Sequence, residues 1–372
     1  MTLNKKIAIL TSSRADYSIY TPLLAELSNK NISYDIIAFG SHTSFFYGNT
    51  IQNIKNDGYK VNFSLNSLIH GDTPETISDS MGLTIIKFSE LWKNNNYCLI
   101  IALGDRYEMF SAVISSLPFN IPIAHISGGE VTLGAIDNVF RDSLSVAADL
   151  HFTSTAQYSK RVAQIKNSSE QIHNVGALNV DYIKNINLYT IKEFYEKFKI
   201  NLNNKTILIT FHPETVGHNK NKKYITTLIR VLKNLKDYQI VITQTNADTN
   251  GLIIRSELEK FAKYNNNIKL IESFGSKGYI TCMHYCKWML GNTSSGFVEA
   301  TYKRKIVINI GDRQKGRILT SNIINSKIIY NDLMNAIRKA EKMIKPKPNY
   351  IYGNGSTAKK IVNILQKTYV KF

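Results

Sequence analysis

Three carboxylate residues in the first half of the chain are spaced in a way that suits acid/base chemistry. Asp105 follows the apolar run Tyr97–Leu103, Glu130 follows another apolar run and two glycines, and Asp137 comes seven residues later. We expect both runs to be parallel strands, which end at one edge of their sheet. Crowded carboxylates raise the pKa of at least one member, so we predict an acid/base set here. The simpler alternatives are a helix cap at Asp137 and a hydrogen-bonded loop carboxylate at Glu130.

Arginines accompany these carboxylates at the same kind of position. Arg14 lies in the turn Ser13–Ser18 after the first apolar run, Arg106 follows Asp105 directly, and Arg141 lies four residues after Asp137. A guanidinium group binds two phosphate oxygens at once, and a helix N-terminus adds backbone donors. These turns therefore suit an anionic ligand, although a surface arginine beside a capping residue, or a local ion pair, explains each one separately.

The second half of the chain carries a different set of strand-end residues. His212 follows the apolar run Thr206–Thr210, where it suits contact with a diphosphate. Gly291–Glu299 combines a glycine, small hydroxyl residues and an expected helix start, which together favour a phosphate site. It is not a Walker loop, because the lysine of that motif is absent. We expect Glu299 about one turn into the helix, and the basic loop Gly311–Arg317 to face the same ligand.

Short β-branched runs alternate with longer amphipathic stretches, a pattern typical of parallel sheets covered by helices on both faces. The expected strands of the first half are Ile7–Thr11, Tyr34–Phe39, Tyr97–Leu103, Ile121–His125, Leu150–Thr153 and Ile172–Val175. Those of the second half are Thr206–Thr210, Gln239–Thr243, Ile268–Ile271, Lys287–Leu290 and Ile306–Ile310. The clearest expected helices are Thr76–Lys93 and Tyr224–Lys236. The fold class is therefore α/β, with two Rossmann-like lobes facing a cleft.

A length of 372 residues favours two domains over one. The alternation of expected strands and helices begins again near residue 205, so we place the domain boundary between about 183 and 203. The expected division is 1–190 for a lobe that carries the carboxylates, 191–348 for a phosphate-binding lobe, and 349–372 for a C-terminal helix that packs back on the first lobe. We expect that helix to run from Ser356 to Thr368, with Ser356 as its N-cap.

The formal charge of +18 raises the question of a nucleic-acid or membrane partner. The lysines are dispersed, with short clusters only at Lys220–Lys223 and Lys342–Lys347, so we expect neither partner. A basic nucleic-acid-binding protein remains the alternative, and it would show binding that depends steeply on salt.

The N-terminus has no signal-peptide pattern, and no apolar stretch is long enough to span a membrane, so a soluble cytoplasmic protein is expected. The three cysteines should be reduced. We expect Cys282 and Cys286 to be buried thiols and not metal ligands, and we expect no metal and no cofactor.

The turns named above resemble those of the hydrolysing UDP-N-acetylglucosamine 2-epimerases in order and spacing, and the resemblance extends to Gly40-Ser41-His42 and Tyr47–Thr50. It implies the two-lobed GT-B fold, with UDP bound mainly by the second lobe, and release of UDP with inversion at carbon 2 to form N-acetylmannosamine. It makes Asp105, Glu130 and Asp137 the acid/base set, and it implies a homodimer or homotetramer. The substrate or UDP contacts that it implies are Arg14, Ser18, His42, Arg106, Arg141, His212, Asn246, Phe274, Thr293, Ser294, Glu299 and Arg313.

One departure of the sequence from this family matters. Members often have histidine directly after the Arg141 position, whereas this chain has Asp142. A role for that histidine cannot be transferred, and the extra carboxylate could alter the acid/base set or reflect a different sugar. Ser127 also lies at a variable position that could touch the sugar. A 2,4-diacetamido-trideoxy UDP-sugar is therefore an open alternative substrate, and a GT-B glycosyltransferase is a more distant alternative.

Overall fold

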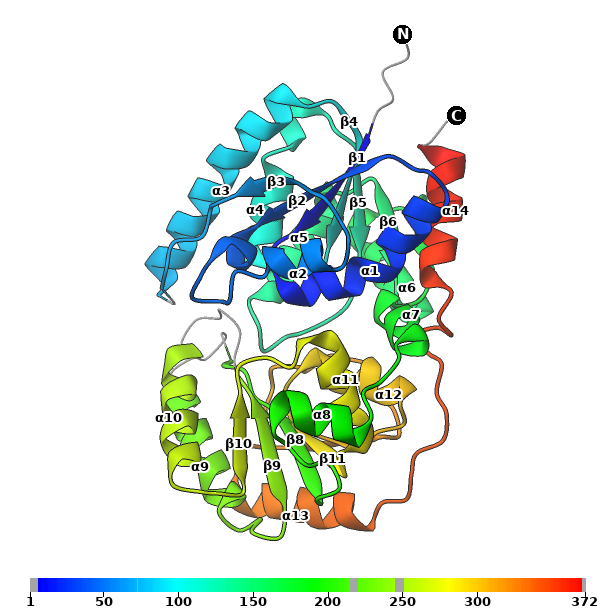
Figure 1. The fold of residues 1–372 in the computed structure, drawn as a ribbon. Helices are drawn as coiled ribbons and strands as arrows, with labels where there is room; N and C mark the ends of the chain where they lie inside the picture. Colours follow the sequence, from blue (N-terminus) through cyan, green and yellow to red (C-terminus); the bar gives the residue numbers. More distant parts are fainter. Residues whose placement is uncertain (1–5, 72, 215–219, 245–250, 370–372) are drawn as a thin grey trace. The chain divides into compact units, whose positions relative to one another are not determined.

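The protein forms two compact units in a computed structural model that describes residues 6–71, 73–214, 220–244 and 251–369 (Figure 1). The first unit comprises Met1–Glu130, Asp137–Lys184 and Ile351–Phe372. The second comprises Val131–Ile136 and Asn185–Tyr350. The chain thus leaves the first unit for six residues immediately after Glu130 and returns to it at Asp137.

The first unit is built on a parallel sheet of seven strands in the order β3-β2-β1-β4-β5-β6-β7. The order reverses between β1 and β4, and in doubly wound sheets ligands bind at the carboxyl ends of the strands beside this point. The strands are β1 (Lys6–Thr11), β2 (Tyr34–Phe39), β3 (Val61–Leu65), β4 (Tyr97–Leu103), β5 (Ile123–Ile126), β6 (Leu150–Thr153) and β7 (Ile172–Asn174).

Both faces of this sheet are buried, which explains its continuous apolar strands. Side chains of β1 alternate between two cores: Ile7 and Ile9 pack on one face, and Ala8 and Leu10 on the other. The first face is covered by α1 (Arg14–Asn29) and α14 (Thr357–Thr368), which Figure 1 shows side by side. The second is covered by α3 (Pro74–Asn94), α4 (Tyr107–Ile114) and α5 (Asp137–Ala147). The remaining helices are α2 (Ile51–Asn56), α6 (Ala156–Lys166) and α7 (Leu178–Asn185), with 3₁₀ turns η1 (Gly40–Thr43) and η2 (Leu117–Phe119).

The C-terminal helix α14 begins where the sequence predicts, but a different residue caps it. Ser356 occupies the N-cap position, yet its hydroxyl donates to Asn354 and makes no cap hydrogen bond. The backbone N–H groups of Thr357 and Ala358 instead donate to the two carboxylate oxygens of Asp181, at 2.9 and 2.8 Å. A buried aspartate on α7 therefore holds the N-terminus of α14, 176 residues away in sequence.

The second unit repeats the same winding on a parallel sheet of six strands, in the order β10-β9-β8-β11-β12-β13. The strands are β8 (Thr206–Thr210), β9 (Gln239–Thr243), β10 (Ile268–Ile271), β11 (Trp288–Gly291), β12 (Val307–Ile310) and β13 (Ile323–Ser326). Its helices are α8 (Ile191–Phe198), α9 (Asn221–Leu232), α10 (Gly251–Lys263), α11 (Gly275–Tyr285), α12 (Glu299–Tyr302) and α13 (Tyr330–Lys342), with a 3₁₀ turn η4 (Ser294–Gly296). Its switch point lies between β8 and β11.

The predicted α/β class with two Rossmann-like units is confirmed. The prediction missed two strands, β3 and β13, which form sheet edges. It also placed Glu299 one turn inside a helix, whereas Glu299 is the first residue of α12, a helix of only four residues that follows η4.

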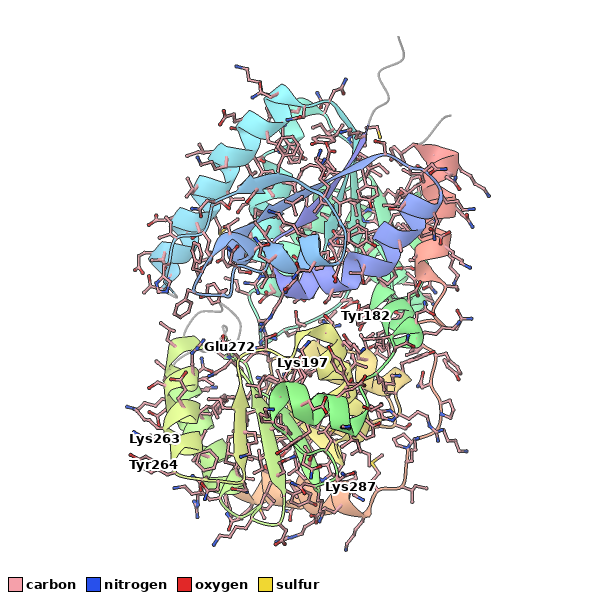
Figure 2. The ribbon with its side chains drawn as sticks, viewed as in Figure 1. Tyr182, Lys197, Lys263, Tyr264, Glu272 and Lys287 are labelled. Atoms are coloured by element: carbon pink, nitrogen blue, oxygen red, sulfur yellow. The ribbon has the colours of Figure 1, made fainter. Side chains whose placement is uncertain are left out.

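Basic residues are dispersed over the second unit. Figure 2 shows Lys197 on α8, Lys263 at the end of α10 and Lys287 before β11 at separate places. Cys282 and Cys286 are buried free thiols, as predicted. Within the described ranges, no helix is both long and apolar enough to cross a membrane.

Candidate active site

The turn after β1 in the first unit is organised around the buried carboxylate of Asp16. This group accepts hydrogen bonds from the Thr11 hydroxyl at 2.6 Å and from the Ser12 backbone N–H at 2.8 Å, and it completes a capping box with Ser13 at the start of α1. Burial alone would raise the pKa of Asp16, but hydrogen bonds and the charge of His42 hold it below its usual value. The network fixes the turn that carries Arg14.

His42 belongs to this network and is completely buried. Its Nδ1 is bonded to the Thr50 hydroxyl at 2.7 Å and its Nε2 to the Thr11 hydroxyl at 2.9 Å. Both ring nitrogens are thus engaged by hydroxyl groups of the first unit, and a substrate contact of His42 stays a prediction. Through Thr11, His42 is linked to Asp16 and so stabilises the turn that carries Arg14.

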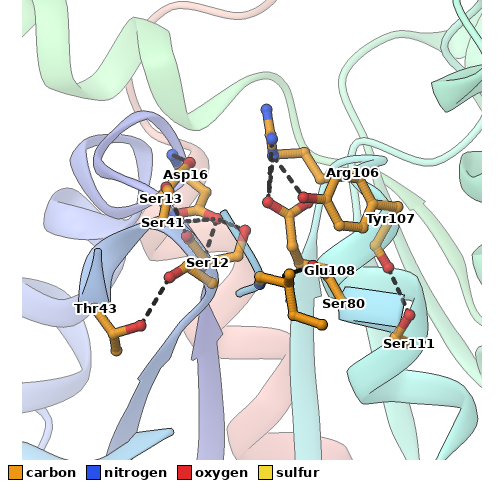
Figure 3. Close-up of polar contacts among 12 residues, drawn as sticks. Ser12, Ser13, Asp16, Ser41, Thr43, Ser80, Arg106, Tyr107, Glu108 and Ser111 are labelled. Carbon is orange, nitrogen blue, oxygen red and sulfur yellow. Dashed lines mark hydrogen bonds and ion pairs between the residues drawn. The ribbon is translucent and has the colours of Figure 1, made fainter. Parts of the chain in front are cut away.

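The turn after β4 pairs Arg106 with a carboxylate that the sequence analysis did not single out. Glu108 is 1% exposed, and its two oxygens accept from Nη2 of Arg106 at 3.1 Å and from Nε at 3.2 Å (Figure 3). Burial raises the pKa of Glu108, and the Arg106 charge opposes that rise. Gly40 has φ +58°, which favours glycine, and a Cβ there would lie 3.0 Å from the Ser12 backbone oxygen and 3.3 Å from Cγ of Glu108, so glycine suits the close approach of the turns after β1, β2 and β4.

Arg141 joins two of the three predicted acid/base residues. Its side chain is 2% exposed, forms an ion pair with the Asp105 carboxylate and donates from Nη1 to the backbone oxygen of Glu130 at 2.9 Å. The buried Glu130 carboxylate accepts from the Ser154 hydroxyl at 2.9 Å. Asp137 is the first residue of α5, one turn before Arg141, and is partly exposed. The structure thus brings Asp105, Arg141 and Glu130 together at the ends of β4 and β5.

Asp142, the residue at which this chain departs from the resemblance, has a partner of its own. Nη1 and Nη2 of Arg161 on α6 each donate to one Asp142 oxygen at 2.7 Å, which is a bidentate pair. Asn138 donates to the same carboxylate at 3.2 Å. Both Asp142 oxygens are therefore engaged between α5 and α6.

In the second unit, the loop after β8 is held by a neutral side chain. The carboxamide of Asn292 is completely buried, accepts from the His212 backbone N–H at 2.7 Å and donates to the His212 backbone oxygen at 2.8 Å. Gln314 donates to the backbone oxygen of Asn292 at 2.9 Å. These hydrogen bonds hold the loops after β8, β11 and β12 together beside the switch point.

The loop after β12 is also fixed by Glu214. The Glu214 carboxylate accepts from the Asp312 backbone N–H at 2.7 Å, and Nε of Arg313 donates to the Pro213 backbone oxygen at 3.2 Å. Burial is the main cause that raises the pKa of Glu214, and the Asp312 charge adds to the rise. Glu214 and Asn292 were not predicted as site residues, because nothing in sequence signals a partner 80 or 98 positions away.

The remaining predicted contacts are distributed as follows. Thr293 and Glu299 are partly exposed and Ser294 is exposed, all on the segment after β11, so their polar atoms can reach a ligand. Ser18 lies on α1 and is partly exposed. Phe274 is buried against the rings of Phe194 and Phe198. Asn246 lies outside the described residues.

Comparison with known proteins decides the family. The model of the UDP-N-acetylglucosamine 2-epimerase family matches residues 25–366. A relative from Campylobacter jejuni, named GDP/UDP-N,N'-diacetylbacillosamine 2-epimerase (hydrolyzing), is 38% identical over 91% of this chain and 88% of its own. The chain belongs to the hydrolysing UDP-N-acetylglucosamine 2-epimerase family.

Two further proteins are similar over most of the chain. The polysialic acid biosynthesis protein P7 of Escherichia coli is 32% identical over 90% of this chain and 85% of its own. A crystal structure of UDP-GlcNAc 2-epimerase from Neisseria meningitidis bound to UDP-GlcNAc has the same fold, with a TM-score of 0.82, 18% identity, and coverage of 98% of this chain and all of the other.

Proposed function

We propose that this protein removes UDP from a UDP-N-acetylhexosamine and inverts carbon 2 of the sugar, with water as co-substrate. The observation that carries the proposal is the pairing of Asp105 with Arg141, whose side chain also binds the Glu130 backbone at adjacent strand ends of the first unit. Asp105, whose carboxylate pairs with Arg141, and Glu130, whose backbone binds the same arginine, suit proton removal and proton return.

The proposed reaction has two stages. Carbon 2 carries a weakly acidic hydrogen, so a carboxylate removes that proton as the bond from carbon 1 to UDP breaks, leaving a glycal. Water then adds its hydroxyl to carbon 1, and a protonated carboxylate delivers a proton to carbon 2 from the opposite face. We assign these steps to Asp105, Glu130 and Asp137, without distributing the base and acid roles among them.

Release of UDP needs groups that bind its growing negative charge. We propose that the second unit supplies them through His212, Arg313 and the Thr293–Ser294 segment, all of which follow strand ends at one switch point. Their loops are held in place by Asn292, Gln314 and Glu214, so little rearrangement is needed at the moment of reaction. Arg14 and Arg106 are the proposed contacts from the first unit.

For the sugar, we favour UDP-N,N'-diacetylbacillosamine over UDP-N-acetylglucosamine. The support is the 38% identity to a relative named for that 2,4-diacetamido sugar, whereas a relative named UDP-N-acetylglucosamine 2-epimerase is 26% identical. UDP-N-acetylglucosamine, which would yield N-acetylmannosamine, remains the second candidate, and both are tested together.

The test is incubation with each UDP-sugar in heavy water, followed by proton NMR. We expect free UDP and a 2-epimer that carries deuterium at carbon 2, with the diacetamido sugar turned over at least tenfold faster. Product without deuterium would exclude the glycal route, and no UDP release from either sugar would exclude the proposal.

Variants of the carboxylates sharpen this test. Asp105→Asn, Glu130→Gln and Asp137→Asn should each lower turnover by about 10²–10⁴ with a modest change in UDP affinity, since a positioned acid or base contributes about that much. Asp35→Asn is the matched control, because this buried carboxylate binds Lys6 and Tyr97 at the amino ends of β1 and β4. Its turnover should stay within about threefold of wild type, by the usual size of effects remote from a site.

A further inference from the structure

The six residues 131–136 belong to the second unit, although in the chain they connect two parts of the first. We call this stretch, Val131–Ile136, segment 131–136. Its backbone is bonded to the loop after β12, where Leu133 N–H donates to the Lys315 oxygen at 2.9 Å. Thr132 and Ala135 are buried, so the segment is a packed element and not a free linker.

Glycines make this packing possible. A Cβ added to Gly134 would overlap the backbone oxygen of Asp312 and would lie 2.6 Å from Cα of Arg313. A Cβ added to Gly316 would overlap Cγ1 of Val131. The segment and the loop after β12 therefore approach each other through backbone, at a distance that side chains at these two positions would prevent.

The two ends of segment 131–136 are residues to which acid/base roles were assigned. Glu130 precedes Val131 directly, and Asp137 follows Ile136 directly. Glu130 is additionally held by Arg141 and Ser154, and Asp137 is the first residue of α5. A displacement of the loop that carries Arg313 would therefore be transmitted along the backbone of segment 131–136 to both carboxylate residues.

We propose that segment 131–136 positions Glu130 and Asp137 by resting on the Arg313 loop, so that nucleotide binding and carboxylate placement are coupled. This inference rests on the proposed function, because it takes Arg313 as a UDP contact. Gly134 is a positioning residue in this scheme: it touches no reacting atom, and it acts through the two carboxylates.

The deciding variant is Gly134→Ala, with Gly82→Ala as its control. Gly82 lies in α3 with no atom within 4 Å of an added Cβ, so alanine fits there. We expect Gly134→Ala to lower kcat at least tenfold while UDP affinity, measured by calorimetry, changes less than threefold. Gly82→Ala should leave both values unchanged. Displacement of one reacting group by about 1 Å can cost about 10²-fold in rate, which sets this scale.

Hydrogen exchange on the wild-type protein gives a second measurement that needs no variant. UDP alone should slow amide exchange within residues 131–136 as well as in the loop 311–317. If Gly134→Ala does not fold, Val131→Ala, which only shortens the side chain against Gly316, provides the same two readouts with a smaller loss of kcat.

The outcomes separate the two claims. Wild-type protein that binds no UDP overturns the proposed function and this inference with it. UDP binding with unchanged exchange in 131–136, or a Gly134→Ala variant with wild-type kcat, overturns only the role of the segment. Equal losses of kcat and UDP affinity in Gly134→Ala would show a general distortion of the Arg313 loop, and would also overturn it.

Discussion

The strand-end turns of the two units are stabilised in different ways. In the first unit, carboxylates hold them: Asp16 accepts from hydroxyl and backbone donors, Glu108 pairs with Arg106, and Asp105 pairs with Arg141. In the second, the corresponding loops are held by carboxamides and backbone groups around Asn292 and Gln314, together with the carboxylate of Glu214.

This difference matches the work proposed for each unit. A unit that moves protons needs ionisable groups whose partners tune and orient them, and removing one partner exposes the other to a large desolvation cost. A unit that binds a fixed diphosphate needs donors held rigidly in place, which neutral amides provide without competing charge. We therefore expect substitutions in the first unit to affect turnover, and those in the second to affect nucleotide affinity.

The largest effect is expected from Arg141→Met. This change leaves the Asp105 carboxylate and the Glu130 backbone oxygen without their shared partner. Turnover should fall by about 10²-fold or more, because misplacement of reacting groups has costs of that size. UDP affinity should stay within about threefold, a change too small to signal the loss of a direct charged contact. Kinetics of UDP release and calorimetry with UDP measure the two quantities.

Arg161→Met is the control for this prediction. It also removes a carboxylate-paired arginine from the first unit, but Arg161 is partly exposed and its partner is Asp142. If Arg141→Met weakens UDP binding as much as it lowers kcat, Arg141 contacts the nucleotide directly, and the distinction between the two units fails at its central residue.

The next largest effect is expected on the stability of the first unit at low pH, and it depends on buried histidines. The sheet of the first unit contains His125 on β5 and His151 on β6, which are register neighbours, whereas the described strands of the second unit contain no histidine. Burial lowers the pKa of His125 to about 4 and that of His151 to about 3. Both histidines stay neutral in the folded protein, whereas in the unfolded chain they bind protons below about pH 6.5. The free energy of unfolding should therefore be highest above about pH 6.5 and should decrease as pH falls toward 4.

The two tryptophans allow each unit to be followed separately during an acid titration. Trp92 lies on α3 of the first unit and Trp288 on β11 of the second, and both are buried. Trp288→Phe protein should lose its Trp92 signal at a higher pH than Trp92→Phe protein loses its Trp288 signal. The His125 contribution is on the order of 3 kcal/mol at pH 4. His125→Gln should reduce this difference, and substitution of the exposed His70 should not; coincident transitions would contradict the prediction.

Asn292→Leu is expected to have a moderate effect of the opposite type. It leaves the His212 backbone N–H and oxygen buried without their partner, at a cost of about 1–3 kcal/mol for each unsatisfied group. We expect UDP affinity to fall about tenfold and kcat to change less. Asn322→Leu is the control, since Asn322 is equally buried in the second unit but binds Thr301, Thr320 and Lys305.

Local sequence pattern predicted the sheets well where strands are central. Tyr97–Leu103 and Thr206–Thr210 match β4 and β8 at both ends, because a strand covered on both faces must be an unbroken apolar run. The edge strands β3 and β13 were missed, since their less buried sequences lack that run. The positions of Asp105, Glu130 and Arg141 relative to the expected strands correctly predicted that they lie near neighbouring strand ends.

Partners distant in sequence could not be predicted in this way. The bonds of Asn292 to His212 and of Asp181 to the start of α14 join positions 80 and 176 apart, and no local pattern marks them. Segment 131–136 was missed for the same reason, because its packing depends on the absence of side chains at Gly134 and Gly316, and turn glycines are common. Buried polar contacts of this kind emerge only once the fold has been built.

The smallest effect is expected at Asp142, which stands where the family resemblance implies histidine. Both carboxylate oxygens bind Arg161, and the two side chains are 29% and 28% exposed, so the pair contributes no more than about 1 kcal/mol. Asp142→Asn, and equally Asp142→His, should therefore change kcat and kcat/KM less than about threefold, measured as UDP release. A loss of about 10²-fold in Asp142→Asn would make Asp142 a fourth member of the acid/base set. Charge in the first unit would then act on the substrate beyond the turns of β4 and β5, and the ion pair with Arg161 would have to open during turnover.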